Sequence, residues 1–196
     1  MTDLFQEPDD ATPLTAEERE GLLQTWITNR HDLNEAEEEN ILKATAWARR
    51  QKNLASVLND EFAKSLHKRM FGEVWQWAGA YRQTGKTIGI DAYRIPVETV
   101  SLFNDAHYGV KNKTYPPDET AIRLHHRLVA IHPFPNGNGR HARLMADLVI
   151  QLQGKEPYSW GRGKLADVGA LRTQYISALR AADDHNIQPL LAFARS

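Results

Sequence analysis

The sequence predicts a nearly all-helical protein. Most of the chain carries apolar residues at helical spacing, and several of these segments begin with acidic residues and end with basic ones. Only one stretch shows the alternation and glycine turns that are typical of strands. The chain has 196 residues, of which 41% are hydrophobic, and can therefore bury a sizeable core. We expect an all-α fold with one short β-hairpin.

The composition excludes several function classes. The chain has 24 Lys and Arg against 25 Asp and Glu, so its overall charge favours neither nucleic acid nor an acidic membrane surface as a partner. It has no cysteine, which excludes disulfides, a thiolate nucleophile and cysteine-bound zinc. No apolar leader and no apolar run near the length of a membrane span is present. We expect a cytoplasmic protein.

The N-terminal part predicts a polar lead-in followed by helices. Residues 1–13 are polar and contain two prolines. Thr15 and Glu18 have the spacing of a capping box, which predicts a helix to about Ile27. Asn34 is the expected N-cap of a second helix, whose first turns are acidic and whose end is basic.

The remaining elements follow from periodicity and turn residues. Apolar residues four apart predict a third helix over 56–71, and the glycines and alternating residues near 82–91 predict the hairpin. A helix resumes near Val97. Gly154, with a proline soon after it, marks a helix end. Further helices are expected over 118–131, 139–153 and 165–182.

The loop between two of these helices carries the candidate site. Residues 132–143 read HPFPNGNGRHAR, in which glycines precede a helix start. Glycine lets backbone N–H groups converge on a ligand, and the helix N-terminus adds about half a positive charge. Gly137, Asn138 and Gly139 are therefore candidates for an anion cradle.

Charged side chains flank this cradle. Arg140 and Arg143 are three apart on the following helix and could each bind phosphate oxygens. His132 ends the preceding helix and could take a proton from a group bound there. Taken alone, these parts fit an ordinary helix connection with a packed histidine equally well.

The complete string resembles the signature of the Fic (filamentation induced by cAMP) family. That signature reads His, any, Phe, any, Asp or Glu, Gly, Asn, Gly, Arg, two of any kind, Arg. The upstream FGEVWQWAGAYR is similar to the family segment that leads into a hairpin called the flap, and the resemblance covers roughly residues 55–185. Within the family, the chain is most similar to the mobile mystery protein B group, because of the stretch LNEAEEENI and of the letters HAR that end the motif. The matching positions are His132, Phe134, Gly137, Asn138, Gly139, Arg140 and Arg143.

The resemblance implies a Fic-type helical bundle with one flap. Residues 1–54 then hold the lead-in and a candidate inhibitory helix, and residues 55–196 form the core domain of a single compact unit. The implied activity is transfer of AMP from ATP, with Mg²⁺ or Mn²⁺, to a hydroxyl of a target protein bound along the flap. His132 is then the general base, and the phosphates are bound by Gly137, Asn138, Gly139, Arg140 and Arg143. Gly139 favours AMP transfer over phosphorylation, because the phosphorylating Doc relatives carry Lys there.

Two positions depart from the family pattern. Asn136 stands where the family has an acidic metal ligand, so Mg²⁺ binding should weaken. This departure leaves a second function open, a nucleotide-binding interaction module without turnover. Glu39 is the expected inhibitory residue, paired with Arg143, because Glu39 and Asn40 fit the second half of the family's inhibitory pattern. The first half is missing, and an ordinary acidic helix start explains Glu39 equally well.

Overall fold

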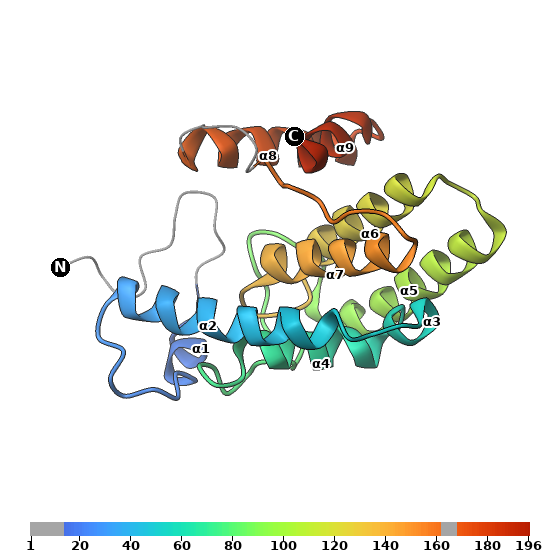
Figure 1. The fold of residues 1–196 in the computed structure, drawn as a ribbon. Coiled ribbons are helices and arrows are strands. Elements are labelled where there is room, and N and C mark those ends of the chain that lie inside the picture. The colour runs from blue at the N-terminus through green and yellow to red at the C-terminus, as the bar shows by residue number, and fades with distance from the viewer. Residues whose placement is uncertain (1–13, 162–167) are drawn as a thin grey trace.

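Helices α6 and α7 lie side by side in the middle of the structure, and the candidate loop connects them (Figure 1). The computed structural model describes residues 14–161 and 168–196. The expected lead-in over 1–13 and the first residues of the helix expected over 165–182 lie outside these ranges. The elements are α1 (Ala16–Glu20), α2 (Arg30–Ala48), α3 (Leu54–Val57), α4 (Asp60–Phe71), the 3₁₀-helix η1 (Ala92–Arg94), α5 (Ile95–Asn112), α6 (Pro117–Ile131), α7 (Asn138–Leu152), α8 (Val168–Asp183) and α9 (Gln188–Arg195).

The helices pack as pairs around a shared apolar core. α2 packs along α4, α5 packs on α6, and α8 packs with α9, which also contacts α6 (Figure 1). The all-α fold expected from the sequence is confirmed. No described helix is apolar over a length that could cross a lipid bilayer. The largest fully buried apolar side chains include Trp75, Phe71, Phe103, Phe134, Leu33, Leu66, Met70, Ile95, Ile122, Leu124 and Leu128.

The helix starts follow local capping, and two helix boundaries, one end and one start, differ from expectation. The capping box of Thr15 and Glu18 is formed, but α1 ends at Glu20 rather than near residue 27. The N-cap of α2 is Asn29 rather than Asn34. Asn29 has extended backbone angles, and its side chain accepts a hydrogen bond from the backbone N–H of Asp32 at 3.1 Å.

The helix expected over 56–71 is divided at Asn59. Asn59 is extended and caps α4, because its side-chain oxygen accepts from the backbone N–H of Phe62 at 2.8 Å. The residues before it form the single turn of α3. The last helix, α9, was not expected, and it begins with a proline in its first turn.

The hairpin expected near 82–91 is not formed. Residues 83–91, which we call the flap segment, have no strand pairing, and the described residues contain one isolated bridge, between Leu22 and Trp75. The buried guanidinium of Arg82 offers the physical reason. It donates to the backbone carbonyls of Thr84, at 2.7 Å, and of Ile90, so these groups do not serve a strand partner.

Candidate active site

The candidate loop is held between two left-handed residues. His132 follows the end of α6 with φ 54° and ψ 60°, and Gly137 precedes α7 with φ 77°. A Cβ atom at Gly137 would lie 2.5 Å from the ring of Phe71, so both the backbone angle and the space require glycine. The two turns reverse the chain tightly and bring His132 close to the start of α7.

Buried side chains fix the shape of this loop from inside. The Asn138 side chain accepts from the Phe134 N–H at 2.9 Å and donates to the Phe134 carbonyl at 2.8 Å. The Phe134 ring is fully buried and stacks on His67 with 3.7 Å between centroids. Asn138 therefore braces the loop with its side chain, and only its backbone N–H can serve a ligand.

His67 on α4 supports the same loop, and no sequence pattern predicts this role. Its Nδ1 accepts a hydrogen bond from the Gly79 N–H at 3.0 Å, so its Nε2 carries the proton and donates to the Asn136 carbonyl at 3.0 Å. Burial is the main reason that the pKa of His67 lies well below its usual value, with the nearby His141 as a second cause. His67 is therefore neutral at physiological pH and acts as a fixed brace.

His132 is suited to accept a proton. Its Nδ1 is buried without a hydrogen-bond partner among the described residues, so Nε2 is the ring nitrogen that can reach a substrate. Burial, followed by the positive charge of Arg82, lowers the pKa of His132 to about 4, and Lys86 acts in the same direction. The Val129 carbonyl opposes these effects. The imidazole is therefore neutral, and can act as a base, at every pH well above 4.

The start of α7 has the form of an anion site. Its first N–H groups, from Asn138 to Arg140, have no acceptor within the helix, whereas the His141 N–H already donates to the Gly137 carbonyl at 2.9 Å. A Cβ atom at Gly139 would meet nothing within 4 Å. Open space thus lies beside the N–H groups that a phosphate would need.

Arg140 is held by an acidic residue of α2. One carboxylate oxygen of Glu37 accepts from the Arg140 guanidinium at 2.6 Å, and the other accepts from Trp75 Nε1 at 2.6 Å. The Glu37 side chain is 5% exposed and the Arg140 side chain 33%. Arg140 also lies over the ring of Phe71, 4.8 Å from its centroid. A buried carboxylate therefore holds Arg140, the arginine that is predicted to bind phosphate.

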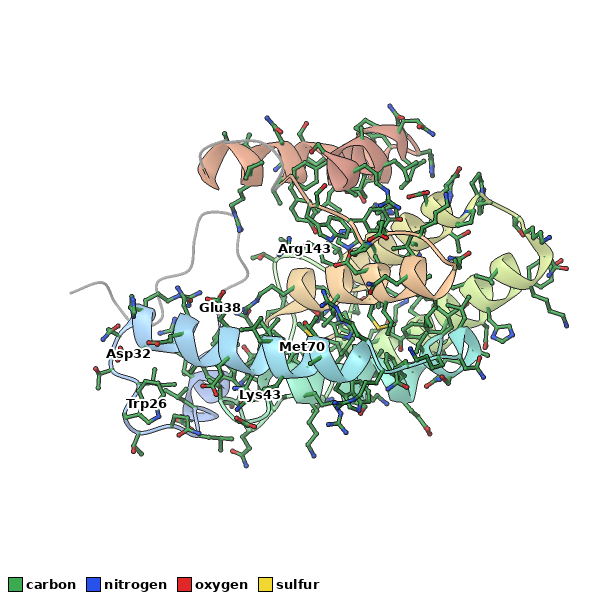
Figure 2. All side chains as sticks on the ribbon, in the orientation of Figure 1. Trp26, Asp32, Glu38, Lys43, Met70 and Arg143 are labelled. Atoms are coloured by element: carbon green, nitrogen blue, oxygen red, sulfur yellow. The ribbon has the colours of Figure 1, made fainter. Side chains whose placement is uncertain are left out.

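The expected pair between Glu39 and Arg143 is wrong. Glu39 is 70% exposed and pairs with Lys43 at 3.1 Å, one turn along α2. Figure 2 shows Lys43 and Arg143 on opposite sides of the bundle, with Lys43 below α2 and Arg143 above α7. Two residues of α2 that are two positions apart face nearly opposite directions, so only one of them can face the motif.

Arg143 lies on the side of α7 that faces α8. Its guanidinium is 5.5 Å from the ring centroid of Tyr175. Burial raises the pKa of Tyr175, whereas the charge of Arg143 and a hydrogen bond from Arg143 lower it. Arg140 and Arg143 thus contact different layers of the bundle, α2 on one side and α8 on the other. A ligand bound by both would lie across the first turn of α7.

The surroundings of Asn136 do not fit a metal ion bound by protein carboxylates. The Asn136 side-chain oxygen accepts from the Gly137 N–H at 2.5 Å. Among residues 14–161 and 168–196, no group of three or more histidine or acidic side chains could hold a metal. A divalent ion here would depend on oxygen atoms brought by a nucleotide.

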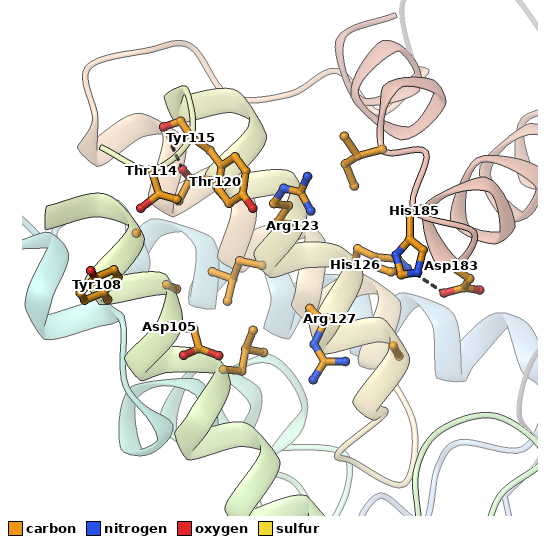
Figure 3. Close-up of a pocket in the computed structure, with 17 residues that line it drawn as sticks. Asp105, Tyr108, Thr114, Tyr115, Thr120, Arg123, His126, Arg127, Asp183 and His185 are labelled. Atoms are coloured by element: carbon orange, nitrogen blue, oxygen red, sulfur yellow. Dashed lines mark hydrogen bonds and ion pairs between the residues drawn. The ribbon is translucent and has the colours of Figure 1, made fainter. Parts of the chain in front are cut away.

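A cavity of about 740 Å³ lies elsewhere, between α5, α6 and the turn after α8 (Figure 3). None of the motif residues lines it. Two of its basic side chains contact acidic partners, since Arg123 pairs with Glu119 at 2.7 Å and His126 lies 2.7 Å from Asp183. The candidate site for a phosphate therefore remains the start of α7.

Comparisons with known proteins agree with this geometry. Residues 57–150 match the Fic/DOC family model. Protein adenylyltransferase Fic of Nematostella vectensis is 30% identical over 132 residues, which cover 65% of this chain and 29% of the relative. Protein adenylyltransferase fic-1 of Caenorhabditis elegans is 32% identical over 80 residues, 41% of this chain and 14% of the relative. The chain thus spans less than a third of the length of these two relatives.

Solved structures show the same fold. BepC of Bartonella tribocorum, solved with bound AMPPNP, superposes with a TM-score of 0.67 at 18% identity, covering 92% of this chain and 97% of BepC. Fic-1 of C. elegans gives a TM-score of 0.64 at 22% identity, covering 90% of this chain and 51% of that one. The mobile mystery protein B subgroup stays a prediction. Residues 57–150 of the chain form a Fic/DOC family domain.

Proposed function

We propose that the protein is an adenylyltransferase that moves AMP from ATP to a hydroxyl of a target protein. The observation that carries this proposal is a neutral histidine, His132, at the start of the loop that leads into α7, whose first N–H groups have open space beside them. The names of the curated relatives support the reaction class. A cytoplasmic setting is part of the proposal, because that compartment supplies ATP.

Each group has a defined role in this reaction. Nε2 of His132 accepts the proton of the target hydroxyl while that oxygen bonds to the α-phosphorus and pyrophosphate leaves. The N–H groups at the start of α7, from Asn138 to Arg140, stabilise charge on the phosphates. Arg140 and Arg143 hold the leaving phosphates and so orient the α-phosphate toward His132.

Mg²⁺ or Mn²⁺ would enter with ATP and neutralise phosphate charge. The amide oxygen of Asn136 already accepts from the Gly137 N–H, so the protein contributes little to that ion. The same observation favours a second candidate function, a nucleotide-binding module without turnover.

The contact between Glu37 and Arg140 supports a restrained activity. ATP phosphates that bind Arg140 have to compete with a carboxylate that is 5% exposed and 2.6 Å from the guanidinium. We assign to Glu37 the inhibitory role first expected of Glu39. The target protein is proposed to lie along the flap segment, next to His132.

Transfer of label from α-labelled ATP tests the proposal. The purified protein, with Mg²⁺ or Mn²⁺, should label itself or an added protein target, and His132→Ala should abolish the label. ATP binding without label in the wild-type protein would support the module. Label that persists in His132→Ala would exclude His132 as the base.

A further inference from the structure

We propose that Arg82 is a positioning residue that links the flap segment to the backbone of His132, so that one guanidinium sets the place of the target and of the base together. This inference rests on the proposed function and names a residue that the family motif does not contain. The sequence offered no signal for it beyond its place at the entry to the flap segment.

The contacts of Arg82 reach two separate segments. Its Nε donates to the His132 carbonyl at 2.7 Å, and Nη2 reaches the Ile131 carbonyl at 3.4 Å. Nη1 donates to the Thr84 carbonyl at 2.7 Å, and Nη2 also donates to the Ile90 carbonyl. The guanidinium therefore joins the two ends of the flap segment to the C-terminal end of α6.

These acceptors are groups that need a donor. The last carbonyls of a helix have no partner within the helix, and a cation near them is favoured by the helix dipole. Arg82 is 2% exposed, so its donors cannot exchange freely with water. Its backbone N–H also donates to the Pro133 carbonyl at 2.9 Å. Removing the guanidinium would take this donor from the His132 carbonyl at the end of α6 and from the half-buried Thr84 and Ile90 carbonyls of the flap segment.

The flap segment is also in direct contact with His132. A Cβ atom at Gly89 would lie 2.6 Å from the His132 Cβ and 2.8 Å from Arg82 Nη2, and Gly89 has φ 106°. The segment thus crosses His132 at a residue that must be glycine. A displacement of the flap segment would carry the Arg82 contacts, and with them the His132 carbonyl, in the same direction.

Several charges act around this junction. Arg82 and Lys86 both lower the pKa of His132, after burial as the main cause. Burial lowers the pKa of Arg82 itself, whereas the charges of Glu18 and Asp91 raise it. Lys86 is paired with Glu18 of α1, so its charge is partly balanced. Loss of the Arg82 charge should therefore move the pKa of His132 upward.

Lysine cannot replace arginine here without loss. The planar guanidinium donates in several fixed directions, whereas an ammonium group is a single point with three donors on a flexible stem. Arg82→Lys keeps the charge and loses the joint contact with both segments. Arg82→Met removes the charge and most of the contacts at similar length. Arg94→Lys is a matched control, because Arg94 follows the flap segment but is 52% exposed and pairs with Glu98.

Hydrogen exchange and histidine NMR test the proposal without depending on activity. Arg82→Met should raise amide exchange in residues 83–91 by roughly tenfold or more, as local opening becomes easier. It should also shift the His132 titration, identified by its absence in His132→Ala, from about 4 toward the ordinary value near 6.5. Arg82→Lys should raise exchange with a smaller shift in titration. Arg94→Lys should change neither.

Kinetics separate positioning from a purely structural role. A displaced base should lower kcat by roughly a hundredfold with little change in the KM of ATP. Unchanged exchange and an unchanged His132 titration in folded Arg82→Met overturn the proposal. If Arg82→Met does not fold, Arg82→Lys decides by the same exchange measurement. Absence of transfer in the wild-type protein would count against the proposed function only, since exchange and titration still decide the role of Arg82.

Discussion

Glu37→Gln is the substitution that tests most directly whether α2 restrains the site. The glutamine oxygen can still accept from Trp75 Nε1, which lies 2.6 Å from one Glu37 oxygen. The oxygen opposite Arg140 becomes an amide nitrogen, which carries no charge and cannot accept from the guanidinium, and the side chain keeps its size. Glu37→Ala is less informative, because the buried Trp75 N–H would lose its acceptor at a cost of about 1–3 kcal/mol.

The size of the effect follows from the exposure of the two partners. The contact that is lost is a hydrogen bond between charged groups, which contributes about 1.5–3 kcal/mol. Arg140 is 33% exposed, and solvent screening reduces this contribution to roughly 1 kcal/mol. Glu37→Gln should therefore bind ATP about fivefold more tightly, since 1.4 kcal/mol corresponds to tenfold. The melting temperature should fall by about 2–4 °C.

Isothermal titration calorimetry with ATP measures this change, and label transfer at a fixed, subsaturating ATP concentration should rise with it. Glu39→Gln is the matched control on the same helix, because Glu39 is 70% exposed and pairs with Lys43. It should leave ATP affinity unchanged. In an Arg140→Ala background, Glu37→Gln should no longer improve binding, since the two residues act through one contact.

An unchanged ATP affinity in Glu37→Gln would show that the contact with Arg140 does not compete with nucleotide. A gain in Glu39→Gln instead would mean that α2 acts through its exposed face, contrary to the geometry. A gain that persists in the Arg140→Ala background would remove Arg140 from the explanation. Each result contradicts a different step of the reasoning.

Four further predictions concern the loop. Because the pKa of His132 is lowered to about 4, kcat/KM should be flat from about pH 6 to 8 and fall only as the pH drops through about 4; a fall near pH 6.5 would contradict the buried, neutral base. Gly137→Ala should lower the free energy of unfolding by at least 1–3 kcal/mol in denaturant titrations, because φ is 77° and Phe71 is 2.5 Å from the new Cβ. Gly139→Ala, with nothing within 4 Å, should keep its stability but weaken ATP binding in calorimetry; weakened folding instead would place Gly139 in the core. Asn136→Asp should lower the Mg²⁺ concentration needed for half-maximal transfer, and an unchanged metal titration would show that residue 136 does not contact the ion.

The fold could be predicted from the sequence to the extent that local rules decide it. The capping box of Thr15 and Glu18 and the helix over 117–131 depend on residues close in the chain, and both are formed. The start of α2 could not be placed, because Asn29 and Asn34 are equally good caps and only the structure shows which of them is extended. The hairpin was mispredicted because the Arg82 guanidinium binds the backbone carbonyls of Thr84 and Ile90, and sequence alternation does not reveal that these carbonyls are taken by a side chain.

The candidate site divides in the same way. The motif itself is contiguous, so His132, Gly137 and Gly139 could be recognised from the sequence, and the structure places them around one helix start. Their supports come from elsewhere in the chain. His67 lies 69 residues before its acceptor, and Arg82 lies 50 residues before the His132 carbonyl that it binds. No local pattern connects residues at such separations.

The residue proposed to be inhibitory is different, because the position of its contact could have been found by helix geometry alone. Leu33, Ala36 and Asn40 are buried and form one stripe of α2. Glu37 lies on that stripe, one turn after Leu33, whereas Glu39 is rotated from Glu37 by about 200°. A carboxylate on a buried stripe needs a partner, since an unpaired buried charge is strongly disfavoured. The family resemblance already placed the motif arginines, which are cations, in the core domain. Helix phase therefore indicates Glu37 as the residue on α2 that contacts them. The family's sequence pattern indicates Glu39 instead, two residues away.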